Sequence, residues 1–186
     1  MKKHKFILKI IFTLLLITSL SSCKKNNATN PYNTKNNVNS ENIASSDGIK
    51  WLPYDEGIKK AKKDNKFIFM DFYSESCGYC QKLEKETYSN KKVYEYIDKN
   101  FIPIRVNLSS SKKIVFDGKN IIEQDIAMIF GVNATPTLFF LTPKNEVIGN
   151  VPGFLEAKEL YSIASYIATN SYKKESIKQF KAKQKI

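Results

Sequence analysis

A nearly continuous apolar run, Phe67 to Tyr73, restricts the fold of this chain more than any other feature of its sequence. The residues favour β-structure, and apolar side chains occupy almost every position instead of every second one. This pattern is typical of a strand that is covered on both faces. We therefore expect a sheet with helices on both sides, with the carboxylate of Asp71 inside it.

The flanking segments supply the other elements of such a sheet. The spacing of apolar residues predicts helices at 54–64, 77–88, 91–99, 122–130 and 155–169, and strands at 104–107, 137–141 and 146–149. The helix at 77–88 is expected to carry Cys80, Leu83, Glu84 and Thr87 on one face. The strand at 104–107 is taken to begin after Pro103, because proline cannot donate to a central ladder. Residues 108–120 are predicted to be a loop, with a turn at Asp117-Gly118 capping a small hairpin. The order of elements predicts an α/β fold with a mixed central sheet.

The first residues have the plan of a secretion signal. In residues 1–22, lysines precede a short apolar stretch. The stretch ends in Leu20-Ser21-Ser22-Cys23, which resembles the lipobox of bacterial lipoproteins. The resemblance implies cleavage before Cys23 and lipid modification of its thiol, and more than one acyl chain is required for stable anchoring. The alternative is a signal peptide that is not lipidated. We expect a protein secreted across the inner membrane and lipid-anchored, facing the periplasm or the cell surface.

The remaining boundaries follow from composition. Residues 23–48 are rich in Asn, Ser, Lys and Thr and are expected to form a disordered linker. A folded domain is expected at 49–170. Residues 171–186 are basic and are expected to be a solvated C-terminal tail.

The positive charge does not indicate nucleic-acid binding. The net charge is +12 over 186 residues, but four lysines lie in the signal, two follow Cys23, and residues 171–186 carry a net +5. This leaves a net charge of +1 for residues 26–170. A nucleic-acid-binding face needs basic residues on the folded domain, so we expect no nucleic-acid partner.

Two cysteines in the sequence Cys77-Gly78-Tyr79-Cys80 open the helix at 77–88. Three positions apart, they are close enough to form a disulfide. The amide groups and dipole of a helix N-terminus favour a thiolate at Cys77, whereas Cys80 lies one turn further in. Cys77 is therefore the predicted nucleophile and Cys80 the thiol that resolves a mixed disulfide.

Other uses of a C-x-x-C pattern fit less well. Zinc and iron–sulfur sites usually need four protein ligands, and beyond Cys23 only these two cysteines remain, with the one histidine, His4, in the signal. Haem attachment requires a histidine where Gln81 stands. A purely structural disulfide and a Cu(I) carrier without a third ligand stay open as alternatives. We expect no metal and no cofactor other than the redox-active disulfide.

Two segments resemble the thioredoxin family. Residues 69–80 resemble its strand, turn and active-site helix, and residues 131–140 resemble its cis-proline segment. The resemblance covers about residues 50–168 and implies a thioredoxin-like fold. It implies that Asp71 handles the proton of the resolving thiol and that Pro136 is a cis-proline facing the disulfide. Gly78, Tyr79 and Thr135 are expected to bind substrate, and Gly153 matches a glycine before the last helix.

The family resemblance also implies an activity. Gly78-Tyr79 departs from the Gly-Pro of thioredoxin and, with Thr135, resembles secreted disulfide isomerases. Those isomerases dimerise through an N-terminal domain, which residues 24–48 cannot form. We therefore expect a monomeric thiol:disulfide oxidoreductase, a protein-disulfide reductase for exported proteins that draws electrons from a membrane dithiol donor. A disulfide isomerase, a non-catalytic adapter and a copper carrier are the alternatives.

Overall fold

The computed structural model describes residues 48–184. The predicted signal peptide, Cys23 and nearly all of the predicted linker lie outside these residues. Within the described part, no helix is long and apolar enough to cross a membrane.

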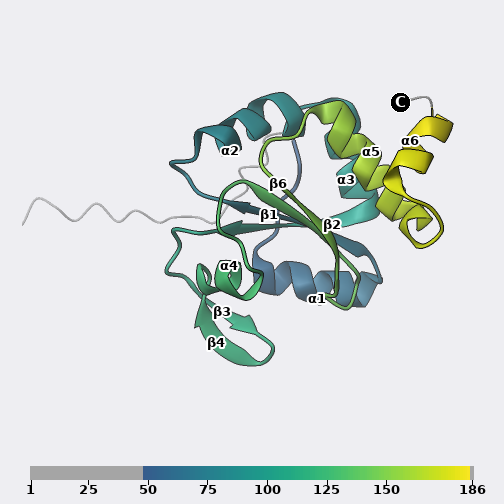
Figure 1. Cartoon of the computed structure of the whole chain (residues 1–186). Coiled ribbons are helices and arrows are strands. Elements are labelled where there is room, and N and C mark those ends of the chain that lie inside the picture. Colours follow the sequence, from purple (N-terminus) through teal and green to yellow (C-terminus); the bar gives the residue numbers. More distant parts are fainter. Residues whose placement is uncertain (1–47, 185–186) are drawn as a thin grey trace, which may run out of the picture. The chain divides into compact units, whose positions relative to one another are not determined.

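A four-stranded mixed sheet forms the centre of the fold, in the order β2-β1-β5-β6. Its strands are β1 (Phe67–Tyr73), β2 (Phe101–Asn107), β5 (Thr137–Leu141) and β6 (Val147–Pro152). Strand β1 pairs in parallel with β2 and antiparallel with β5, and β6 is antiparallel to β5 (Figure 1). The apolar run thus occupies a central strand, and its five inner residues are all buried.

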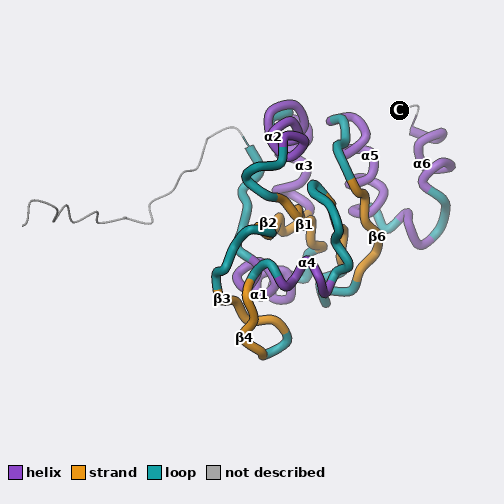
Figure 2. Tube along the Cα trace, turned by 60° about the vertical axis from the view of Figure 1, so that its left-hand side comes forward, coloured by secondary structure: helices purple, strands orange, loops and turns teal. Residues whose placement is uncertain are grey.

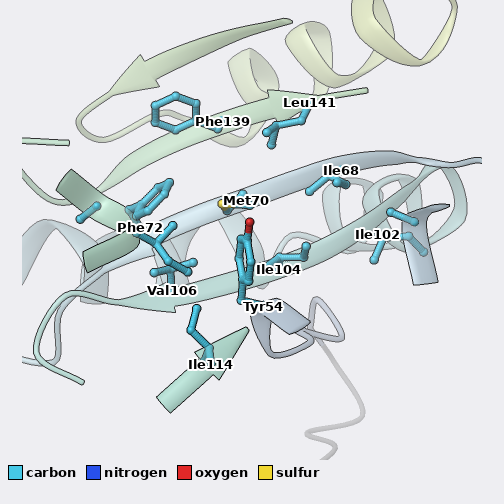
Figure 3. Close-up of a cluster of buried hydrophobic side chains, with 13 residues drawn as sticks. Tyr54, Ile68, Met70, Phe72, Ile102, Ile104, Val106, Ile114, Phe139 and Leu141 are labelled. Atoms are coloured by element: carbon cyan, nitrogen blue, oxygen red, sulfur yellow. The ribbon is translucent and has the colours of Figure 1, made fainter. Parts of the chain in front are cut away.

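Helices cover both faces of the sheet, as the sequence predicted. Helices α1 (Tyr54–Asp64) and α4 (Asp125–Ile129) lie on one face, and α2 (Gly78–Leu83), α3 (Lys91–Asn100) and α5 (Ala157–Ala168) lie on the other (Figure 1). Side chains of β1 alternate between these layers. Ile68, Met70 and Phe72 join the cluster beneath α1 (Figure 3), whereas Phe69 packs on the α2 side. This alternation directs Asp71 toward the layer that carries the cysteines.

Strand β2 begins three residues earlier than predicted and includes Pro103. The reason is its position at the edge of the sheet. The Pro103 carbonyl accepts from Leu52 N–H at 2.9 Å, and Arg105 N–H donates to the Leu52 carbonyl at 3.1 Å. Odd-numbered residues of β2 thus direct their backbone groups away from β1. The missing N–H of Pro103 lies on this outer side, where the β1 ladder does not need it.

The predicted helix at 77–88 is divided. After α2 the chain makes a π-turn, Glu84–Tyr88, in which Ser89 N–H donates to the Glu84 carbonyl five residues back. Thr87 and Tyr88 in the wider turn are buried, whereas Glu84, its first residue, is about half exposed. Of the four residues expected on one face, Cys80, Leu83 and Thr87 are thus buried and Glu84 is not.

The segment between β2 and β5 contains more β-structure and less helix than expected. Strands β3 (Lys113–Phe116) and β4 (Lys119–Ile122) form a hairpin that stands apart from the main sheet (Figure 2). Asp117 and Gly118 both have positive φ at its turn, as a two-residue hairpin requires. The ring of Phe116 stacks on Tyr54, so the hairpin packs on α1. Ile122 belongs to β4, and α4 begins only at Asp125.

The C-terminal residues are not a solvated tail over their described length. A 3-10 turn (Ser171–Lys173) leads to helix α6 (Ile177–Gln184). Phe180 is buried against the ring of Tyr166 on α5, with 5.4 Å between ring centroids. The expectation of a tail rested on the lysines and overlooked this aromatic anchor.

Candidate functional site

The two cysteines lie where β1 passes into α2 and form a disulfide. Cys77 is the N-cap of α2, and its sulfur accepts from Cys80 N–H at 3.1 Å. Cys77 is partly exposed, whereas Cys80 is 3% exposed. A disulfide of another protein can therefore reach Cys77 Sγ and not Cys80 Sγ. The Cys80 N–H stabilises negative charge on Cys77 Sγ.

The Thr135–Pro136 segment lies against this disulfide. The peptide bond between the two residues is cis, and the Thr135 carbonyl oxygen is 3.4 Å from Cys77 Sγ. Two hydrogen bonds hold the segment in place. Gly153 N–H donates to the Pro136 carbonyl at 2.8 Å, and the Thr137 hydroxyl donates to the Ala134 carbonyl at 2.7 Å. These hydrogen bonds hold the Thr135–Pro136 segment in a fixed position beside Cys77 Sγ.

Asp71 is fully buried on the side of the sheet that carries α2. Its Oδ2 accepts from Arg105 Nε at 3.2 Å, and its Oδ1 has no hydrogen-bond partner among the described residues. Burial raises the pKa of this carboxyl group to about 6, although Arg105 opposes the rise. Asp71 therefore exchanges a proton close to neutral pH, which suits a proton acceptor for a thiol.

Arg105 is a site residue that the sequence analysis missed. Its place opposite Asp71 follows from the parallel register of β1 and β2. Its Nη2 lies 2.8 Å from Glu84 Oε2, and its guanidinium lies 4.2 Å from the Tyr73 ring centroid. The sequence contained one signal for this residue. Arg105 is the only arginine in the chain, and every other basic residue apart from His4 is a lysine.

A cavity of about 330 Å³ opens beside the buried cysteine. Cys80 and Arg105 both line it, together with Tyr73, Ser74, Glu75, Gln81, Glu84 and Lys85. The cavity therefore brings Cys80 to the same space as Arg105 and Glu84.

The remaining predicted residues lie at the rim. Gly78 is exposed, and the Tyr79 side chain is 65% exposed, which suits contact with a large partner. On the same helix, Lys82 Nζ lies 4.4 Å from the ring centroid of Phe154, next to Gly153. No group of three or more metal-ligating side chains occurs in residues 48–184.

Comparison with known proteins agrees with this geometry. The sequence model of the thioredoxin-like domain matches residues 54–168. Mouse anterior gradient protein 3 is 28% identical over 109 residues, which are 58% of each chain. The chain spans less than two thirds of the length of such curated relatives.

Solved structures show the same fold. A thioredoxin-fold protein from Helicobacter pylori matches with a TM-score of 0.55 and 24% identity, over 66% of this chain and 81% of that one. A disulphide-isomerase candidate from Bacteroides thetaiotaomicron matches with a TM-score of 0.52 and 25% identity, over 67% of this chain and 96% of that one.

Proposed function

Since this chain belongs to the thioredoxin-like domain family, we propose that its Cys77–Cys80 pair acts as a protein-disulfide reductase on exported proteins. The fold and the dithiol support a thiol:disulfide oxidoreductase in general. The proposal concerns the direction of electron transfer, from this protein to its substrate, and the identity of the substrates as exported proteins. The observation that carries it is the difference in exposure between the two cysteines. Cys77 is partly exposed beside the Thr135–Pro136 segment, and Cys80 is buried.

The exchange proceeds in two steps. The Cys77 thiolate attacks one sulfur of a substrate disulfide, which forms a Cys77–substrate disulfide and releases the other substrate sulfur as a thiolate. The Cys80 thiolate then attacks Cys77 Sγ, which forms the Cys77–Cys80 disulfide and releases the second substrate thiolate. The substrate gains two electrons and the protein loses two. A membrane dithiol donor restores them by the same chemistry in reverse.

Asp71 serves the second step. Cys80 must lose its proton before it can attack, and a buried carboxylate with a pKa near 6 accepts that proton at neutral pH. Thr135 presents backbone groups beside Cys77 to an extended substrate segment, and Gly78 and Tyr79 contact the substrate at the rim.

Trapping in cells tests the activity. The Cys80→Ala variant is expected to accumulate exported proteins in mixed disulfides with Cys77, because nothing resolves them. The Cys77→Ser variant is the control and should trap nothing. A Cys80→Ala variant without adducts would contradict the proposal. A reduction potential near about −270 mV would support the reducing direction, and one near about −120 mV would reverse it.

The location has its own test. The proposal places the domain outside the inner membrane, anchored through lipid on Cys23, and is supported by the signal-like residues 1–22. The parent protein should incorporate a labelled fatty acid in cells, and the Cys23→Ser variant should incorporate none. The variant's rate of disulfide exchange after purification should be unchanged. A parent protein that incorporates no fatty acid would contradict the lipid anchor.

A disulfide isomerase is the second candidate. It is favoured by Gly78-Tyr79 and Thr135 and by the 25% identity to the Bacteroides disulphide-isomerase candidate. Scrambled ribonuclease distinguishes the two functions. A catalytic amount of reduced protein restores ribonuclease activity if it isomerises, whereas a reductase only releases free thiols.

A further inference from the structure

Three charged side chains form a chain of ion pairs from the core to the surface. Arg105 Nε lies 3.2 Å from Asp71 Oδ2, and Arg105 Nη2 lies 2.8 Å from Glu84 Oε2. The exposed side-chain fractions are 1% for Asp71, 21% for Arg105 and 50% for Glu84. Arg105 therefore pairs through Nε with a buried carboxylate and through Nη2 with a solvated one.

The guanidinium group is held in this position by its neighbours. It lies over the Tyr73 ring and 5.1 Å from the Trp51 ring centroid. The planar guanidinium of arginine can lie against aromatic rings and pair with two carboxylates through two different nitrogens at once. A lysine ammonium lacks this planar group and carries its charge on one nitrogen. The only arginine in the chain occurs at this position.

Glu84 is the first residue of the π-turn, and its own N–H still donates to the Cys80 carbonyl as in a regular α-helix. Because the Glu84 carbonyl accepts from Ser89 N–H, the helix widens and directs Thr87 and Tyr88 into the core. Glu84 remains at the surface, where it reaches the outer nitrogen of Arg105. π-turns occur frequently at functional sites.

The ion-pair chain adjoins the resolving cysteine. Cys80, Arg105 and Glu84 all line the cavity of about 330 Å³. The other titratable groups near this cavity and the ion-pair chain are Tyr73, Glu75, Lys85, Tyr88 and Glu123. None of these forms a hydrogen bond or an ion pair with Arg105 in the described structure.

We propose that Glu84 is a positioning residue for proton transfer at Cys80: it shares the Arg105 guanidinium with Asp71 and so limits how far Arg105 stabilises ionised Asp71. The inference rests on the proposed function and deepens it. Arginine shared by two carboxylates stabilises each one less than arginine paired with one alone. The negative charge of Glu84 also repels a charge on Asp71, so both effects keep the proton on Asp71 to a higher pH.

The test measures the proton affinity of Asp71 in the oxidised protein, where neither cysteine titrates. Side-chain carboxyl ¹³C shifts of labelled aspartate, followed from pH 4 to 9, give the pKa of Asp71. We expect Glu84→Gln to lower it by about one unit, since Arg105 is fixed by the rings and then serves Asp71 alone. Glu84→Asp keeps the charge and should restore most of the difference.

A matched control lies on the same turn. Glu86 is exposed to a similar degree, 52%, and pairs with Lys82 instead of Arg105. Glu86→Gln should leave the pKa of Asp71 unchanged. The proposal is overturned if the pKa of Asp71 in Glu84→Gln equals that in Glu86→Gln, or lies above it.

Reduced protein supplies the functional measurement. The rate at which Cys80 resolves a preformed mixed disulfide on Cys77 should reach its plateau about one pH unit lower in Glu84→Gln than in the parent. If the parent protein exchanges disulfides but the pH profiles of the parent and Glu84→Gln coincide, the role of Glu84 is refuted and the proposed reductase activity is not. A parent that exchanges none refutes the proposed function, and the carboxyl titration still decides the role of Glu84.

Discussion

At the scale of single residues, Asp71 links the chemistry of the site to stability. Its pKa is about 6 in the folded protein, against an ordinary value near 3.8. Folding therefore favours the protonated form. The stability that this preference contributes is fully present below pH 4 and is lost as the pH rises through 6. One pKa unit corresponds to about 1.4 kcal/mol, so the total loss is about 3 kcal/mol.

Replacement of Asp71 by Asn should remove this dependence. Near pH 8 the Asp71→Asn variant is expected to be more stable than the parent by up to about 3 kcal/mol, and near pH 4 the two should agree. Denaturant unfolding of the oxidised proteins at several pH values measures the difference. A constant difference between the two curves over that range would contradict the raised pKa.

Arg105→Ala should act in the opposite sense. The substitution leaves a buried carboxylate without its cation, at a cost of about 3 kcal/mol near pH 8. The cost should shrink toward pH 5, because Asp71 is then protonated and needs no partner. The double variant with Asp71→Asn is the control. If the loss near pH 8 persists in that background, it arises from the packing of Arg105 on Trp51 and Tyr73 and not from its charge.

The sequence predicted some of these residues and not others for a physical reason. Cys77, Cys80 and Asp71 lie within one short segment, so local spacing and family resemblance located them. Arg105 joins Asp71 only through the register of two parallel strands, which no local pattern specifies. Glu84 was expected to share a face with Cys80, Leu83 and Thr87, but a helical period does not specify how deeply each side chain on that face is buried.

At the scale of elements, long buried segments were predicted best. Helix α1 and strands β1 and β5 occur at the predicted bounds, because each has an uninterrupted pattern. Errors occurred where tertiary structure overrides local preference. Pro103 is tolerated in an edge strand, and α4 is short because Ile122 pairs in the hairpin instead.

One hydrogen bond joins the π-turn to the segment before α5. The hydroxyl of Thr87, which is 1% exposed, donates to the Leu155 carbonyl at 2.5 Å. Thr87→Val keeps the shape and leaves that carbonyl without a donor, so we expect a loss of about 1 to 3 kcal/mol in unfolding free energy. Ser89→Ala removes a comparable but exposed hydrogen bond to Lys85 and should cost less. Equal losses in the two variants would show that the connection to α5 contributes nothing.

At the scale of the whole molecule, the C-terminal helix lies away from the cysteine site. Helix α6 packs on α5, and none of its residues lines the cavity beside Cys80. A second cavity of about 430 Å³ lies between α6, α5 and β6, so the helix is docked less tightly than a core element. Loss of α6 should therefore leave thiol exchange unchanged.

Phe180→Ala tests this separation. Truncation of the buried ring removes the main apolar contact of α6, and a Phe→Ala change in a well-packed core costs about 3 to 5 kcal/mol. Here the cost is limited to the docking free energy of α6, because the helix can detach while the sheet stays folded. Hydrogen exchange should show lost protection at residues 177–184 and retained protection in β1 and β5. Lys178→Ala, an exposed change on the same helix, should leave both unchanged. If protection in β1 falls together with that in α6, the helix belongs to one cooperative unit with the sheet, and truncation of the C-terminus should then also abolish disulfide exchange.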